Sequence, residues 1–419
     1  MRSLAVVLLG VVLVGACSAA DDGGSAGAPT PTDAAVTTTT VADLPTPTST
    51  TIEIYPDAIV RELRRQAAEP RPVPRSAIPP RHLDVEAFPE ILVPRDRIVY
   101  GGAPPDGIPS IDAPTFAATP EVELDDGEAV VVVTVGGETK LYPIRILIRH
   151  EIVNDVIGGE PVAVTYCPLC NSAVSFLRTA GGTVLDFGTS GTLYRSALVM
   201  YDRQTESLWT HFDGLSVVGD LVGTQLELVS TAVVSWADAR RDHGGALVLT
   251  GDDASNLVYG ENPYQNTDQR LSPPRAFVPD PIDERVAPMA RTVGVALDGE
   301  SVALERSVLA ERRVIDIEIA GRELVGLWAP GQVSAIQAET VAGGDRIGSV
   351  AVVEPVLDGR RLELVAEGDG FVDQDGTTWS ILGVATSGPS EGRTLAIVPS
   401  IDTFWFAWSG YHPDTALAG

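Results

Sequence analysis

Residues 128–142 read EAVVVVTVGGETKLY and carry the clearest fold signal in this 419-residue chain. A run of β-branched residues from Ala129 to Val135 meets Gly136-Gly137, and a second short apolar run ends at Tyr142. Two such runs around a Gly-Gly pair predict a β-hairpin, because glycine adopts the positive φ angles of a tight two-residue turn. The segment therefore predicts that the chain forms antiparallel sheet here.

The same signals recur downstream and predict a predominantly β, α+β fold. We expect a helix over 144–154, strands over 162–166 and 197–201, and a hairpin of 172–178 with 183–187 around Ala180-Gly181-Gly182. The preceding segment, 52–119, is rich in proline and predicts an N-terminal arm packed on the body, with one helix over 57–67.

The chain also resembles itself. Val135-Gly136-Gly137-Glu138-Thr139 matches Leu297-Asp298-Gly299-Glu300-Ser301 at an offset of 162, and further matches follow in the same order. This predicts two degenerate copies of one mostly antiparallel β unit packed together, the first over 120–284 and the second over 285–419. Positions aligned with His150 and Cys167 are Arg312 and Ala329, so the second copy lacks the cysteine chemistry. The alternative is that hairpins share common sequence patterns without duplication.

The N-terminus resembles an export signal with a lipid anchor. Residues 1–16 combine Arg2 with an apolar run too short to span a bilayer, and Val14-Gly15-Ala16-Cys17 resembles the cleavage site of bacterial lipoproteins. Acylation of Cys17 would anchor the protein on the extracytoplasmic face of the cell membrane. Residues 17–51 then form a Thr/Pro/Ala-rich linker that cannot bury a core. An ordinary signal peptide with an incidental cysteine is the alternative.

Charge excludes one class of partner. The formal net charge is −28, and Lys140 is the sole lysine. An acidic body repels phosphate backbones, so we expect no nucleic-acid partner.

Tyr166-Cys167-Pro168-Leu169-Cys170 holds both thiols other than Cys17. Outside the cytoplasm, a C-x-x-C pair forms a redox couple, part of a metal site, or a structural disulfide or buried thiol pair. Cys-Pro-x-Cys resembles glutaredoxin-like redox sites, but the residues after it predict strands, whereas those sites need a helix. A structural disulfide would close a very short loop and would add little stability.

A metal site needs more ligands than two thiolates. His150 and His243 are candidates, and thiolate with imidazole suits copper or zinc. Glu151, beside His150, could serve as a ligand or as an acid/base group. For each histidine alone, a hydrogen-bonded core or capping imidazole is the alternative.

A glycine-containing loop and a pair of charged residues could support this site. Gly188-Thr189-Ser190-Gly191 predicts a tight turn or a backbone nest for a small anion, because Thr192 replaces the glycine that a serine nucleophile elbow requires. Asp202 and Arg203 could pair and orient the loop near the cysteines, or could stabilise a turn.

Several motifs together resemble a bacterial and archaeal family known as domain of unknown function 3179. The resemblance covers about residues 95–419 and rests on stretches that occur in order: 106–112 (DGIPSID), 150–155 (HEIVND), 165–170 (TYCPLC), 187–191 (FGTSG), 198–205 (LVMYDRQT) and 207–209 (SLW). The family implies no activity or cofactor. This chain departs from the pattern at Asp242-His243-Gly244-Gly245, where His-Pro-Asp-Thr is expected; that motif stands at 412–415, in the second copy.

These observations favour a lipid-anchored redox or metal-handling protein of the cell envelope, working with an envelope partner. The alternative is a non-catalytic binding or scaffold lipoprotein with structural cysteines. Geometry discriminates between them: an imidazole within about 4 Å of both sulfurs favours metal. Sulfurs on an exposed loop favour thiol exchange, and sulfurs sealed in the core favour the scaffold.

Overall fold

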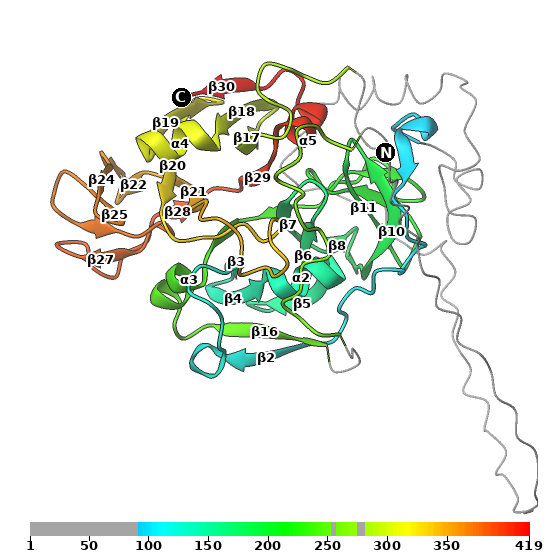
Figure 1. Cartoon of the computed structure of the whole chain (residues 1–419), viewed down its shortest axis with the longest axis horizontal. Coiled ribbons are helices and arrows are strands. Elements are labelled where there is room, and N and C mark those ends of the chain that lie inside the picture. Colours follow the sequence, from blue (N-terminus) through cyan, green and yellow to red (C-terminus); the bar gives the residue numbers. More distant parts are fainter. Residues whose placement is uncertain (1–90, 253–256, 275–280) are drawn as a thin grey trace, which may run out of the picture. The chain divides into compact units, whose positions relative to one another are not determined.

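The computed structural model describes residues 91–252, 257–274 and 281–419. Strands dominate it, and most strand pairs are antiparallel, as the sequence predicted (Figure 1). The predicted signal segment, the linker, the helix over 57–67 and most of the proline-rich arm lie outside the described residues. No helix in the described parts of the chain has the length and apolar character needed to cross a lipid bilayer.

The predicted hairpin is present. β3 (Ala129–Val135) pairs with β4 (Glu138–Pro143), and both turn glycines, Gly136 and Gly137, have positive φ. The next helix, α2 (Ile144–His150), is shorter than predicted: Glu151 adopts a φ of 59° and the β-branched residues after it form β5 (Ile152–Ile157). β-branched residues favour extended chain, and this local preference ends the helix.

A four-stranded sheet follows α2 and carries the cysteines. Its order is β14-β7-β6-β5, with β6 (Glu160–Cys167), β7 (Ser172–Leu177) and β14 (Leu228–Val229). The predicted pairing of 172–178 with 183–187 is wrong, because β7 pairs with β6 instead. The glycine turn joins only the short strands β8 (Thr179–Ala180) and β9 (Thr183–Val184).

Beside it lies a five-stranded sheet of order β1-β10-β11-β12-β13. Its strands are β1 (Ile98–Tyr100), after a short 3-10 turn at Arg95–Arg97, β10 (Phe187–Tyr194), β11 (Ala197–Asp202), β12 (Leu208–Thr210) and β13 (Ser216–Val218). Strand β11 matches the prediction over 197–201.

The first copy ends with β15 (Thr231–Ser235), α3 (Trp236–Asp242) and β16 (Leu247–Asp252). β15 pairs with β3, and β16 runs parallel to β4. A strand from the N-terminal side, β2 (Pro114–Ala118), covers the outer edge of β16, and a 3-10 turn at Thr119–Glu121 follows it.

The second copy repeats this order. Five elements reproduce the bounds of β3, β4, α2, β5 and β6 at the offset of 162: β17 (Arg291–Leu297), β18 (Glu300–Glu305), α4 (Arg306–Arg312), β19 (Val314–Ile319) and β20 (Arg322–Ala329). Near the end of the chain, α5 (Trp405–Tyr411) is the counterpart of α3 at a slightly larger offset, and it lies between β29 (Ile401–Phe404) and β30 (Ala416–Ala418). The sheet β29-β17-β18-β30 reproduces β15-β3-β4-β16, including the parallel last pair. The predicted duplication is confirmed.

Short strands fill the rest of the second copy. They are β21 (Ser349–Glu354), β22 (Val356–Leu357), β23 (Arg360–Arg361), β24 (Val365–Glu367), β25 (Gly370–Val372), β26 (Thr378–Trp379), β27 (Ala385–Ser387) and β28 (Ala396–Ile397). The hairpin β22-β23 corresponds to β8-β9, and the sheet β24-β25-β26-β27 corresponds to β10-β11-β12-β13. One detail recurs as well: Trp209 Nε1 donates to Asp202, and Trp379 Nε1 donates to Asp373.

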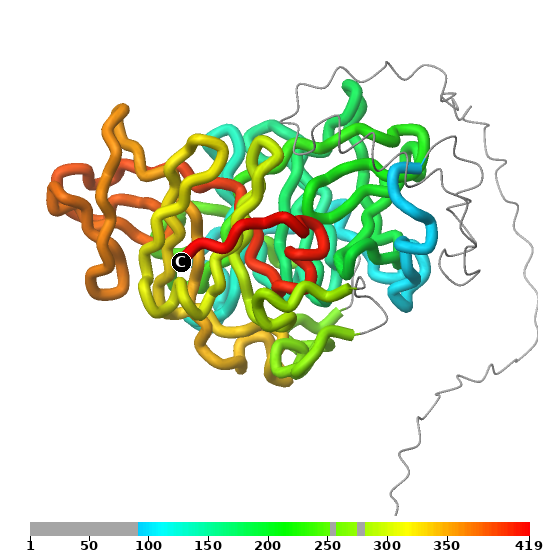
Figure 2. Tube along the Cα trace, turned by 90° about the horizontal axis from the view of Figure 1, so that it is seen from above, coloured from blue at the N-terminus to red at the C-terminus, as the bar shows by residue number. Residues whose placement is uncertain are grey.

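The two copies interlock through reciprocal contacts. β15 of the first copy pairs with β21 of the second at Val233 and Val350, which joins sheets of both copies into one. In the corresponding place, β29 of the second copy packs on β7 of the first, where Phe404 N donates to Cys170 O at 3.2 Å. Figure 2 follows this red C-terminal segment between the yellow strands of its own copy and the green strands of the first. The cysteine turn therefore lies where the two copies meet.

Candidate functional site

The cysteines occupy a β-hairpin turn. Cys167 ends β6 and faces Ser172 at the start of β7, and Cys170 lies in the loop between them. Asn171 closes the turn with a φ of 52°, and its side-chain oxygen accepts a hydrogen bond from Tyr166 Oη at 3.0 Å. This turn contains no helix, as predicted. Both cysteines are free thiols and are sealed from solvent, with exposures of 2% for Cys167 and 0% for Cys170.

The two thiols have opposite acidities. Burial disfavours the Cys167 thiolate, but hydrogen bonds from the Cys170 thiol and from backbone N–H groups of Cys170, Leu198 and Leu169 outweigh it and lower the pKa of Cys167. Burial raises the pKa of Cys170 well above its usual range, and its hydrogen bond to Cys167 and the charge of Cys167 raise it further. The two shifts therefore make Cys167 the more acidic thiol of the pair, with its ionised form held by the Cys170 thiol.

His211 is the imidazole connected to this pair, and the sequence did not single it out. Ser172 Oγ lies 3.0 Å from Cys170 Sγ and 2.9 Å from His211 Nε2, while Thr165 Oγ1 lies 3.3 Å from His211 Nδ1. Burial lowers the pKa of His211 to about 3, so the ring is neutral at physiological pH. His211 follows closely after the Ser207-Leu208-Trp209 motif, and this position in the sequence could have indicated a role at the site.

Glu151 lies on the other side of Cys167. The positive φ at the end of α2 turns this residue inward, and its carbonyl accepts from Tyr166 N at 2.8 Å. Burial, followed by the negative charge of Cys167, raises the pKa of Glu151 to about 8. Tyr264, which the sequence did not predict, donates its hydroxyl to Glu151 Oε1 at 3.4 Å. At pH 7 the Glu151 carboxyl group is therefore mostly neutral, and it lies next to the more acidic of the two thiols.

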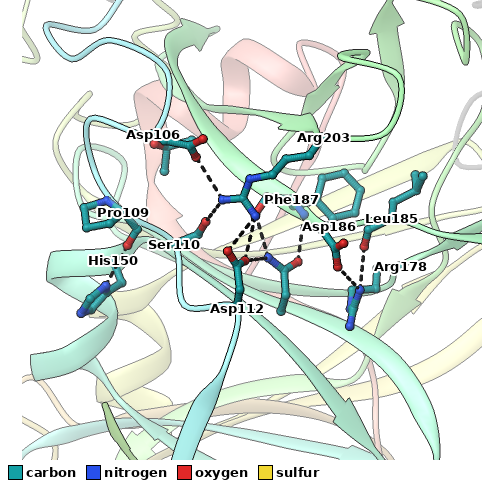
Figure 3. A network of polar contacts seen from close by, with 12 residues as sticks. Asp106, Pro109, Ser110, Asp112, His150, Arg178, Leu185, Asp186, Phe187 and Arg203 are labelled. Carbon is teal, nitrogen blue, oxygen red and sulfur yellow. Dashed lines mark hydrogen bonds and ion pairs between the residues drawn. The ribbon is translucent and has the colours of Figure 1, made fainter. Parts of the chain in front are cut away.

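The histidine predicted to join the cysteines points elsewhere. His150 is buried at the end of α2, with Nδ1 2.7 Å from Pro109 O (Figure 3). Its Nε2 lies 2.8 Å from Tyr259 Oη. Both ring nitrogens therefore have partners other than the sulfurs. The other candidate, His243, follows α3 and lines a cavity between β3, β15 and the second copy.

The four proposed metal ligands are not brought together. In residues 91–252, 257–274 and 281–419, no group of three or more His, Cys, Asp and Glu side chains is arranged to hold a metal ion. His150 and Glu151 are neighbours in the sequence, but their side chains point in different directions at the end of α2. His150 contacts Pro109, whereas Glu151 lies beside the cysteine turn.

The supporting residues form a separate network. Arg203 pairs with Asp106 and Asp112 at 3.2 and 2.8 Å and donates to Ser110 Oγ at 2.7 Å (Figure 3). Asp202 instead accepts hydrogen bonds from Thr205 and from Trp209 Nε1. Of the two alternatives for these residues, the contacts agree with the turn and not with the pair: Asp202 stabilises its own turn, and Arg203 anchors the loop around Asp106 and Asp112.

The segment from Gly188 to Gly191 lies within β10, so it does not form the predicted tight turn. It contains a register shift between Thr189 and Thr192, and Ser190 Oγ donates to Val199 O. At Gly191 the φ is 73°, and a Cβ would lie 1.8 Å from Ala103 O. Glycine is needed here for a β-bulge against which the preceding loop packs.

The second copy closes over the cysteine turn. Thr403 Oγ1 donates to Cys170 O at 2.7 Å, across 233 residues of sequence, and adds to the bond from Phe404 N. Both β29 residues are fully buried. These contacts place β29 of the second copy against the backbone of the cysteine turn.

We expect Thr403→Val to lower the free energy of unfolding by about 1 kcal/mol, because it removes one buried hydrogen bond at nearly constant volume. Denaturant titration measures the change. Thr403→Ser keeps the hydroxyl and is the matched control. Equal losses in both variants would assign the effect to packing rather than to the bond with Cys170.

The fold and the cysteine turn together define a duplicated β protein with one buried dithiol. The family described as "Protein of unknown function (DUF3179)" matches residues 105–415, and the chain belongs to this family. No curated protein and no solved structure matches the chain.

Proposed function

We propose that this protein is a non-catalytic binding lipoprotein of the cell envelope, in which the cysteine turn is structural. The burial of both sulfurs carries the proposal: Cys167 is 2% exposed and Cys170 is fully buried. A thiol that exchanges with a partner must reach it, whereas the Cys170 sulfur is held by Ser172 and the backbone of the turn is held by Thr403 of the second copy. The alternative hypothesis, a metal site, would need an imidazole in contact with both sulfurs, and the described residues show no such contact.

A dithiol redox role is the second candidate, and the split acidities of Cys167 and Cys170 favour it. In that reaction the Cys167 thiolate attacks a partner disulfide and expels one partner thiolate. Cys170 then loses its proton to a partner thiolate and attacks Cys167, which releases the second partner thiolate. Two electrons pass to the partner, and a Cys167–Cys170 disulfide remains. The turn would have to open for this exchange, since both sulfurs are buried.

One experiment separates these functions. The full-length chain and its Cys167→Ser/Cys170→Ser variant are purified from an oxidising compartment and compared by elemental analysis and by alkylation with and without denaturant. The structural role predicts no stoichiometric metal and two thiols that react only after denaturation. Stoichiometric copper or zinc that disappears in the variant would establish a metal site. A disulfide that equilibrates with glutathione in the folded protein would establish the redox role.

The location in the envelope rests on residues 1–51, outside the described part of the chain. We propose that Cys17 is acylated, so that the linker over 17–51 holds the body off the extracytoplasmic membrane surface. The protein should then partition into the detergent phase of a phase-separating detergent. Cys17→Ala should move it to the aqueous phase or leave its signal uncleaved. Equal partitioning of the two proteins, with the signal segment removed from both, would contradict lipidation.

A further inference from the structure

A cavity of about 390 Å³ lies between the two copies, away from the cysteines. The first copy contributes side chains from β3, β4, β15 and the end of α3, and the second contributes the segment around β28. The lining residues include Val132, Thr134, Thr139, His243, Thr394 and Ala396. The size and the mostly apolar lining with a few polar groups are typical of small-molecule sites.

The duplication places an equivalent site on the other side of the contact between the copies. Gly294 and Ala296 are the counterparts of Val132 and Thr134 at the offset of 162. His412 is the counterpart of His243 at the slightly larger offset that relates α5 to α3. Gly294, Ala296 and His412 line a cavity of only about 20 Å³. The same architecture is therefore nearly filled in one copy and open in the other.

Trp408 fills the second site. Its ring lies 4.2 Å from the His412 ring, and its Nε1 donates to Thr415 Oγ1 at 3.0 Å. The indole packs directly on Gly294, where a Cβ would lie 2.4 Å from the ring. Only 1% of Trp408 is exposed, so the indole is part of the core of this site.

The first copy lacks this indole. α3 and α5 have the same length, begin with Trp236 and Trp405, and are each followed by the histidine, so Trp408 corresponds to Ala239. Ala239 is fully buried and carries no side chain that could reach across the site. His243 and the apolar walls remain, Val132 stands at the position of Gly294, and the cavity is lined by no Trp, Tyr or Phe side chain of the described residues, whereas Trp408 lines its counterpart.

We propose that this cavity binds a neutral, planar aromatic molecule of about the size of indole or phenol, which packs against His243 as Trp408 packs against His412. Thr394 and the pair of Thr134 and Thr139, whose hydroxyl groups bond to each other at 2.8 Å, offer hydrogen bonds to its polar edge. The net charge of −28, with Asp242 next to His243, disfavours an anionic ligand. This inference extends the proposed binding role by naming a ligand class; it does not depend on the chemistry of the cysteines.

Equilibrium dialysis of the full-length chain against indole, with equal detergent on both sides, tests the proposal. We expect saturable binding of about one indole per chain. Ala396→Trp places an indole on the exposed strand that lines the cavity and should abolish binding. Val365→Trp adds the same group at a 57% exposed site of the second copy and should leave binding unchanged.

His243→Ala removes the proposed stacking partner and should weaken binding about threefold to tenfold, the range typical of one aromatic contact. Near-ultraviolet circular dichroism checks that each variant is folded. Absence of saturable binding to the wild-type chain would overturn the proposal, as would unchanged binding by Ala396→Trp. Either failure leaves the structural role of the cysteine turn intact, because the alkylation and metal measurements test that role separately.

Discussion

Glu151→Gln is expected to raise the free energy of unfolding at pH 8 by on the order of 4 kcal/mol and to change it little near pH 4. Burial and the charge of Cys167 raise the pKa of the folded Glu151 to about 8, from an ordinary value of 4.5. Well below pH 4.5 the Glu151 carboxyl is neutral in both the folded and the unfolded chain, so it does not change the free energy of unfolding. As the pH rises toward 8, the unfolded chain loses this proton while the folded chain keeps it, so stability falls. Glutamine does not ionise and avoids that loss.

Denaturant unfolding at several pH values between 4 and 9 measures this effect. Glu160→Gln changes an exposed carboxylate at the start of the same hairpin and is the matched control. Cys167→Ser removes the second cause of the raised pKa, so it should weaken the pH dependence of the wild-type side chain. Parallel stability curves for wild type and Glu151→Gln would show that Glu151 is ionised in the folded protein.

Trp408→Ala should lower the free energy of unfolding by about 3–5 kcal/mol, the cost of removing a fully buried tryptophan. Gly294→Val should also destabilise, because its side chain would collide with the Trp408 ring. The double variant has the valine and alanine that the first copy carries at Val132 and Ala239. We expect its loss to be well below the sum of the single losses, since the valine fills space that the indole vacates.

A double-mutant cycle by denaturant titration checks this coupling. Added indole should restore part of the stability of Trp408→Ala, because a ligand that binds only the folded state shifts unfolding by mass action. It should not stabilise the double variant to the same degree. Additive losses, or no response of Trp408→Ala to indole, would contradict the equivalence of the two sites.

Local patterns in the sequence were sufficient for many elements. The Gly-Gly pair at 136–137 predicted the β3-β4 hairpin, the apolar run at 197–201 predicted β11, and the matches at an offset of 162 predicted the duplication. The predicted pairing of 172–178 with 183–187 was wrong, because the sequence shows a glycine turn but not which strands pair across it. Strand pairing follows the buried face, and β7 (Ser172–Leu177) pairs with the longer, buried strand β6.

The cysteine turn could be predicted only in part. The sequence identified Cys167, Cys170 and Glu151, which do lie together, since they are close in the chain and flank one hairpin. It also assigned His150 and His243 to the same site, although the structure places both elsewhere. His211 and Tyr264 were missed because their partners, Thr165 and Glu151, lie 46 and 113 residues away. Residue type and local spacing do not determine which distant loops meet.

By itself, the sequence determined the strand-rich character of this protein, its family and its duplication, because these depend on local backbone preference and on internal similarity. Only the tertiary structure decided that β7 pairs with β6 around the two thiols, that β29 binds the carbonyl of Cys170, that His211 contacts Ser172, and that one of two equivalent cavities is nearly filled while the other is open. The physical reason is that these features arise from packing between the two copies. Side chains more than a hundred residues apart compete there for the same buried space, and the volume of Trp408 or Ala239 decides the outcome.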